Sequence, residues 1–146
     1  MERTLFEMKV FIPKYETVLN AVKLLDQALV SFPGNQETKA IRRSLVNSGT
    51  NVTPEQIIRE FVLMSDGARA ALNLNGSPRA YIGWYDWQED LRKFSKIYPL
   101  IKFRLIGTTS FSESWCAYVV NGYMQIESIE TAIPEFDTER LVPIFE

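Results

Sequence analysis

Residues 115–128 read WCAYVVNGYMQIES, and this stretch decides the fold. Asparagine followed by glycine between two runs rich in aromatic and apolar residues is a strong short-range signal for a β-hairpin with a two-residue turn. Because side chains alternate along a strand, the position of that turn fixes which residues lie opposite each other. The pairs expected across the two strands are Val120–Tyr123, Val119–Met124, Ala117–Ile126 and Trp115–Ser128.

The two faces of this hairpin differ in polarity. One face carries mostly apolar side chains, whereas the other combines Cys116, Tyr118, Gln125 and Glu127. Antiparallel strands commonly pack one face against a core and leave the other in water. The sequence therefore predicts a hairpin that is buried on one side only.

Outward from the hairpin, two stretches alternate apolar and polar residues, as half-buried strands do. They are residues 4–12, which end at Pro13, and residues 100–106, which follow Pro99. A third, shorter strand is predicted over residues 80–84. Together with the hairpin, these strands predict a sheet.

Two segments place apolar residues at the spacing of one helix face. They are the stripe from Val18 to Phe32 and residues 87–97 with Asp86 as the N-terminal cap. Residues 36–47 are predicted as a short helix with a polar, basic face. A fourth helix is predicted from Thr53, because residues 53–56 combine a capping box with a proline at the first helical position. This helix is expected to stop near Asp66, and residues 47–51 are predicted as a loop.

The order of these elements predicts an α+β fold in which an antiparallel sheet carries helices on one face. Without the helices of residues 36–74, the order is close to β-α-β-α-β-β, the ferredoxin-like arrangement. We therefore expect one domain over residues 1–146, with residues 36–78 as a helical insertion or lobe. Residues 131–146 are expected to dock as a tail, with a short helix capped by Asp137.

The composition excludes several kinds of catalytic site. The chain has no histidine and a single cysteine, Cys116, so a Ser-His triad, an intramolecular disulfide and a cluster of thiolate metal ligands cannot form. Neither of the two glycine-rich phosphate-binding motifs occurs. We therefore predict no catalytic residue, no cofactor and no metal site, and expect the protein not to be an enzyme.

The N-terminus is charged, and the chain holds no run of the about 20 apolar residues that a membrane span needs. We expect a cytoplasmic protein that does not act at a membrane. Residues 1–108 hold 15 Lys and Arg against 11 Asp and Glu, whereas residues 109–146 hold one Arg against seven acids. Such an asymmetry of charge can steer a charged partner.

Two groups of residues are predicted to bind a partner. Trp84, Tyr85 and Trp87 place three large rings within four residues, which is hard to bury completely, and such rings are common interface anchors. The other explanation of this cluster is ordinary core packing. The second group is a set of cations on one helix, for which a solvated helix face is the alternative: Lys39, Arg42 and Arg43.

Asp86, Glu89 and Asp90 are spaced so that three carboxylates can share one helix face. Three oxygen ligands of this kind could hold a magnesium ion. Acidic residues in a first helical turn also interact favourably with the helix dipole, by ~0.3–1 kcal/mol each, without any metal. A metal site at these residues is therefore kept as an alternative hypothesis.

Residues 84–126 resemble a module found in small proteins of phages and other mobile elements. In that module an aromatic and acidic start leads into a helix with an aromatic-Pro stop, then a strand, a polar loop and a strand with an Asn-Gly turn. The resemblance implies a mobile-element origin and a sheet-plus-helix fold, and it implies no catalytic residue. The matching positions are Leu91, Ser95, Tyr98, Pro99, Phe103, Trp115, Tyr118, Asn121 and Gly122.

Three functional hypotheses follow. The first is a non-enzymatic binding protein, encoded by a phage or mobile element, that inhibits a host protein or protein complex through protein–protein contacts, of the anti-defence or anti-CRISPR type. The second is a nucleic-acid-binding accessory protein that uses the basic helical region and the aromatic residues at 84–87. The third is a carboxylate-dependent metal enzyme. An unpaired sheet edge also allows a homodimer.

Overall fold

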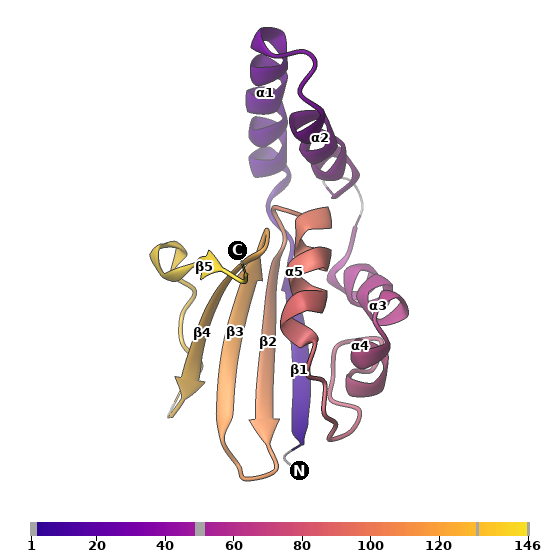
Figure 1. Ribbon diagram of the computed structural model, residues 1–146, viewed down its shortest axis with the longest axis vertical. Coiled ribbons are helices and arrows are strands. Elements are labelled where there is room, and N and C mark those ends of the chain that lie inside the picture. The colour runs from indigo at the N-terminus through magenta and orange to yellow at the C-terminus, as the bar shows by residue number, and fades with distance from the viewer. Residues whose placement is uncertain (1–2, 49–51, 131, 146) are drawn as a thin grey trace.

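The computed structural model describes residues 3–48, 52–130 and 132–145, and it has the predicted α+β class. Its strands form one five-stranded sheet in which every neighbouring pair is antiparallel, and helices cover one face (Figure 1). The strands are β1 (Thr4–Phe11), β2 (Lys102–Thr109), β3 (Ser114–Val120), β4 (Tyr123–Ile129) and β5 (Val142–Pro143).

The sheet is a meander, because its strands lie side by side in chain order. A ferredoxin-like sheet contains strands joined by helical crossovers, and such a crossover connects parallel strands. No parallel pair occurs among the described strands, and β1 lies directly against β2 although five helices separate them in sequence. The ferredoxin-like arrangement predicted from the element order is therefore not the one observed.

The hairpin register is the one predicted from Asn121 and Gly122. All four predicted cross-strand pairs of β3 and β4 are observed. Asn121 and Gly122 both have positive φ, at 49° and 80°, as a two-residue turn that matches the twist of its strands requires. The local turn signal thus sets the pairing of the whole hairpin.

The helices begin and end close to the predicted positions. At the start of α3, the Thr53 hydroxyl accepts a hydrogen bond from the backbone N–H of Gln56, and the Gln56 side chain accepts one from the Thr53 N–H, which confirms the capping box. The helices are α1 (Tyr15–Ser31), α2 (Gln36–Ser48), α3 (Pro54–Met64), α4 (Asp66–Ala71), α5 (Trp87–Ile97) and the 3-10 turn η1 (Thr138–Arg140). Residues 49–51 of the predicted loop lie outside the described residues.

One core lies between the sheet and the helices α3, α4 and α5. Alternate side chains of the strands face these helices, as the period of a strand requires. The sheet contributes Phe6, Met8, Val10, Phe103, Leu105, Ala117, Val119 and Met124 to this core. The helices contribute Ile57, Ile58, Phe61, Val62, Ala68, Ala71, Leu91 and Phe94.

The helices of residues 36–78 lie in two places. α2 packs mainly against α1, and the two form a helical hairpin that extends beyond one end of the sheet (Figure 1). In contrast, α3 and α4 lie beside the sheet and supply part of its core. Among the described residues, no helix is both long and apolar enough to cross a membrane.

Residues 80–84 do not form the predicted strand. In this segment Ile82 makes a single bridge to Thr4, through two backbone hydrogen bonds of 2.9 and 3.0 Å. The chain on either side then leaves the edge of β1, because Trp84 turns into the core. Residues 80–84 therefore make one contact at the edge of β1 and do not form a strand.

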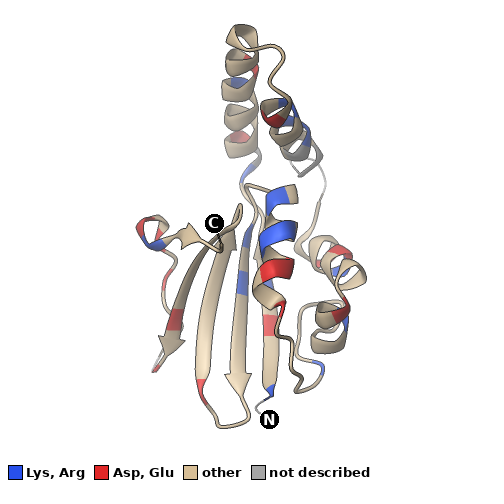
Figure 2. Cartoon of the chain, viewed as in Figure 1, with Lys and Arg blue, Asp and Glu red and all other residues tan. Residues whose placement is uncertain are grey.

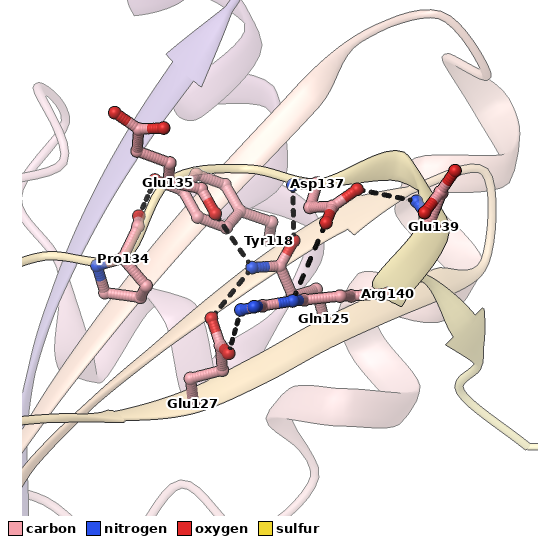
Figure 3. Close-up of polar contacts among 8 residues, drawn as sticks. All are labelled: Tyr118, Gln125, Glu127, Pro134, Glu135, Asp137, Glu139 and Arg140. Carbon is pink, nitrogen blue, oxygen red and sulfur yellow. Dashed lines mark hydrogen bonds and ion pairs between the residues drawn. The ribbon is translucent and has the colours of Figure 1, made fainter.

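The tail crosses the second face of the sheet and covers β3 and β4 (Figure 3). The Tyr118 hydroxyl donates a hydrogen bond of 2.8 Å to the carbonyl of Pro134, and the Gln125 amide donates one of 3.0 Å to the carbonyl of Glu135. In turn, the Asp137 N–H donates one of 2.8 Å to the Gln125 side-chain oxygen. The prediction that this hairpin is buried on one side only is wrong, because the tail covers its other side.

The tail continues from this contact around the edge of the sheet. As predicted, Asp137 caps a short helix, the 3-10 turn η1, by accepting a hydrogen bond from the N–H of Glu139. The chain then forms β5 against β4, and Ile144 enters the core. The tail therefore holds both faces of the outer strands.

Candidate interaction surfaces

Trp84 belongs to the core. Its side chain is 4% exposed, and its ring centroid lies 5.1 Å from that of Phe6 and 5.8 Å from that of Phe61. The indole N–H donates a hydrogen bond of 2.9 Å to an Asp90 carboxylate oxygen, which satisfies the one polar atom of the ring. The prediction that Trp84 contacts a partner is wrong, because nearly all of its surface is already buried.

Tyr85 and Trp87 lie at the surface. Tyr85 is 70% exposed, whereas Trp87 is half-buried and stacks on Trp115 with ring centroids 4.7 Å apart and an interplanar angle of 19°. Together with Ile126, these rings line an open cavity of about 350 Å³. Two of the three predicted aromatic residues are thus placed where a partner could reach them.

The three carboxylates considered for a metal do not converge. Asp90 points inward and accepts hydrogen bonds from Ser65 and Trp84, while Glu89 makes ion pairs with Arg92 and Lys93 at 3.4 and 3.6 Å. Asp86 is the N-cap residue of α5, although its side chain makes no capping hydrogen bond. The described residues contain no group of three acidic, histidine or cysteine side chains placed to share a metal ion. The convergence that the metal hypothesis required is therefore missing there.

The three predicted cations lie together on α2. Lys39, Arg42 and Arg43 line a groove of about 460 Å³ between α1 and α2, together with Asp26 and the apolar side chains Leu29 and Val46. Arg42 makes an ion pair with Asp26. Among the described residues, Lys39 and Arg43 make no ion pair, so the groove has an excess of positive charge. Figure 2 shows the blue positions of α2 on the projecting hairpin.

The hairpin buries little of its own apolar surface. Among the described side chains of α1 and α2, Val18 and Leu45 are the fully buried ones. By contrast, Leu24 is 66% exposed, Val30 83% and Phe32 69%. Two helices that pack mainly on each other leave much of each surface in contact with water.

The two predicted binding groups do not form one surface. The groove between α1 and α2 lies at one end of the long axis of the molecule, whereas the segment that leads into α5 lies toward the other end (Figure 1). A single small partner therefore cannot contact both groups. The two predicted groups therefore belong to two separate candidate sites.

A second cationic group was missed by the sequence analysis. Lys9 from β1 and Lys102 and Arg104 from β2 surround the ring of Phe11 on the second face of the sheet. The alternation of both strands placed these side chains on the polar face, but only the pairing of β1 with β2 brings them together. That pairing joins segments about 90 residues apart, which no local pattern reveals.

Cys116 and Tyr118 lie on the same face, between the cationic group and the tail. Burial raises the pKa of the Cys116 thiol, and the nearby Arg104 charge opposes part of that rise. Burial is also the main cause that raises the pKa of the Tyr118 hydroxyl. Both groups therefore stay protonated at neutral pH, and Cys116 lacks the thiolate character that a nucleophile needs.

No protein-family model, curated protein or solved structure matches the chain.

Proposed function

We propose that this protein is a non-enzymatic binding protein that holds an acidic protein surface in the groove between α1 and α2. The observation that carries this proposal is the projecting hairpin, whose groove combines apolar side chains with Lys39 and Arg43, two cations that make no ion pair among the described residues. In such a complex the protein works by occupying a surface of its partner. This is the mode of action of an inhibitor.

The exposed apolar side chains of the hairpin favour a macromolecular partner. Large apolar side chains that gather on a protruding element commonly mark a protein interaction site. Leu29 and Val46 line the groove between the cations, so an apolar side chain of the partner can enter while acidic residues around it meet Lys39 and Arg43. An amphipathic helix with acidic flanks has this chemistry.

The charge of the groove selects the partner. Arg42 is already neutralised by Asp26, which leaves the two charges of Lys39 and Arg43 for the partner. Charge complementarity of this kind mainly raises the association rate and excludes partners of like charge. A basic protein or a neutral apolar surface would therefore bind less well than an acidic one.

The resemblance of residues 84–126 to phage and mobile-element modules supports the biological side of this proposal. We place the protein with inhibitors that such elements encode against a host protein or protein complex, including the anti-defence and anti-CRISPR classes. The cytoplasm is the compartment in which such an inhibitor acts.

Photo-crosslinking from the groove tests the proposal. A photoreactive amino acid replaces Val46, and the protein is irradiated in a lysate of host cells before the crosslinked protein is identified and purified. We expect a protein with an acidic surface, whose binding the double variant Lys39→Glu with Arg43→Glu abolishes. In calorimetry with the purified partner, the double variant should bind at least ten-fold more weakly than the unmodified protein.

The matched control is Lys93→Glu, which reverses the charge of an exposed lysine on α5. It should bind the purified partner as the unmodified protein does. Equal binding by the groove variant, or equal loss in the control, would remove the groove from the function. A crosslinked protein with a basic or neutral contact surface would contradict the choice of partner.

A further inference from the structure

Three positive side chains gather around one aromatic ring on the sheet face that the helices leave open. Measured to the centroid of the Phe11 ring, Lys102 Nζ lies at 4.6 Å, Lys9 Nζ at 5.6 Å and Arg104 Cζ at 5.6 Å. Lys9 and Arg104 are directly opposite each other in the register of β1 and β2, and Lys102 is opposite Phe11. Two adjacent strands therefore present one compact group, which we call the cationic face.

The cationic face is unfavourable in isolation. Like charges directly opposite each other on neighbouring strands destabilise a sheet. Among the described residues, none of the three cations makes an ion pair. The one acid on the same face of β1, Glu7, is exposed and two positions from Lys9, and it makes no ion pair either among those residues. The charges thus remain in excess, so an anion bound here would be stabilised.

Arg104 adds a second sign of a missing partner. Its Nε is buried and has no hydrogen-bond partner. Among the described residues, no other buried side-chain nitrogen or oxygen lacks one. A buried donor without an acceptor is costly, and most such groups in proteins are paired. Arg104 therefore contributes a positive charge that no ion pair offsets among the described residues.

Among the described residues, the acidic tail makes no ion pair with these cations, although it docks beside them. It contacts the sheet through backbone carbonyls and through the ring of Phe136, whose centroid lies 4.7 Å from Lys102 Nζ. Arg140 makes ion pairs with both Glu127 and Asp137, so these carboxylates are already engaged. The tail covers β3 and β4, and among the described residues none of its carboxylates makes an ion pair with the cations of β1 and β2.

We propose that the cationic face binds the phosphates of a single-stranded nucleic acid. Phosphodiester groups are the anions that three neighbouring cations on a surface can hold in a row. The rings of Phe11 and Phe136 flank Lys102, and aromatic rings beside cations on a sheet face are the arrangement that stacks unpaired bases. This site is distinct from the groove between α1 and α2, and the two proposals stand on different residues.

Fluorescence anisotropy with a labelled 20-nucleotide oligothymidylate tests this proposal. The intact protein is titrated at a series of salt concentrations, beside Lys9→Ala and the control Lys23→Ala, which removes the same charge from an exposed position on α1. Each phosphate contact contributes about −0.7 to the slope of log affinity against log salt. We expect a slope near −2 for the unmodified protein. Lys9→Ala should bind several-fold more weakly with a slope smaller by about 0.7, and Lys23→Ala should bind unchanged.

Three results would overturn the proposal. The first is no anisotropy change at low salt, and the second is an equal loss of affinity in Lys9→Ala and Lys23→Ala. The third is displacement of the oligonucleotide by low millimolar inorganic phosphate, which would assign the face to a single phosphate group. A 20-base-pair duplex serves as a further arm, and binding as tight as that of the single strand would contradict the role of the aromatic rings. Circular dichroism of each variant confirms that it is folded.

Discussion

The side-chain oxygen of Gln125 accepts a hydrogen bond of 2.8 Å from the backbone N–H of Asp137, and the amide end of the same side chain donates one of 3.0 Å to the carbonyl of Glu135. Gln125 is therefore paired at both ends with the backbone of the tail, although it lies on β4 and is almost completely buried. One side chain thus forms with the backbone of the tail the kind of hydrogen bonds that a neighbouring strand would form.

We expect Gln125→Ala to lower the free energy of unfolding by about 1–3 kcal/mol, because it removes both hydrogen bonds between this side chain and the backbone of the tail. Urea unfolding followed by tryptophan fluorescence measures this change. The control is Glu135→Ala, which keeps the backbone carbonyl and should stay within about 0.5 kcal/mol of the unmodified protein. Equal stability of Gln125→Ala and the control would mean that the tail is held by other contacts.

The features that could be predicted from the sequence are those fixed by a few adjacent residues. Asn121 and Gly122 determine the turn and with it the register of β3 and β4. Similarly, Thr53 and Gln56 complete each other's hydrogen bonds within one helical turn. These features need no information from elsewhere in the chain, and the structure confirms them.

The features that could not be predicted depend on pairing between distant segments. The bridge of Ile82 to Thr4 and the docking of the tail on Gln125 each join distant parts of the chain. The local sequence pattern of neither part indicates which other segment it contacts. The same holds for the candidate sites. Lys39, Arg42 and Arg43 follow one helix and were found, whereas the cationic face needs two strands that meet only in the fold.

Trp84→Ala is expected to destabilise the protein by about 3–5 kcal/mol, as the removal of a large buried ring usually does. It also removes the donor that pairs with Asp90. Tyr85→Ala is the matched control, because the ring of Tyr85 is next in sequence and exposed. This variant should change stability by less than about 0.5 kcal/mol. Chemical denaturation of both variants measures the difference. Comparable losses in the two would contradict the burial of Trp84.

Gly76→Ala should be among the more damaging small substitutions. Gly76 has a φ of 87°, and a Cβ built there lies 2.2 Å from the carbonyl oxygen of Met8, which is backbone and cannot move aside easily. Left-handed backbone alone costs a non-glycine residue roughly 1–2 kcal/mol, and the clash adds to this. Gly34→Ala is the control, since no heavy atom beyond the glycine and its two chain neighbours lies within 4 Å of its Cβ position. Thermal unfolding should therefore separate the two variants clearly, with Gly34→Ala close to the unmodified protein.

Stability should decrease in alkaline solution. Burial raises the pKa of Cys116 in the fold, whereas in the unfolded chain the thiol ionises near pH 8.5. Above about pH 8.5 the unfolded state therefore releases a proton that the folded state keeps, so the stability that is complete below this pH is lost as the pH rises toward the folded pKa. Tyr118 lowers stability in the same direction above about pH 10. Its pKa is raised in the fold, so the folded state keeps the hydroxyl proton that is donated to Pro134, while the unfolded state releases it.

Urea unfolding between pH 7 and pH 10 measures this loss. Cys116→Ala removes the thiol and should show a smaller decrease between pH 8.5 and pH 10 than the unmodified protein, whatever its stability at pH 7. An identical pH dependence of the two proteins would show that the thiol does not ionise in this range on unfolding.

Hydrogen exchange should show that the helical hairpin is less stable than the rest of the molecule. Regions with few buried apolar contacts open locally at low free energy, and α1 and α2 bury one described side chain each. In α5, by contrast, Leu91 and Phe94 are fully buried against the sheet. Amides of α1 and α2 are therefore expected to exchange well before those of α5 and of the central strands β2 and β3. Protection of the hairpin equal to that of α5 would mean that the packing of α1 on α2 is enough to stabilise both helices. No partner would then be needed to cover them.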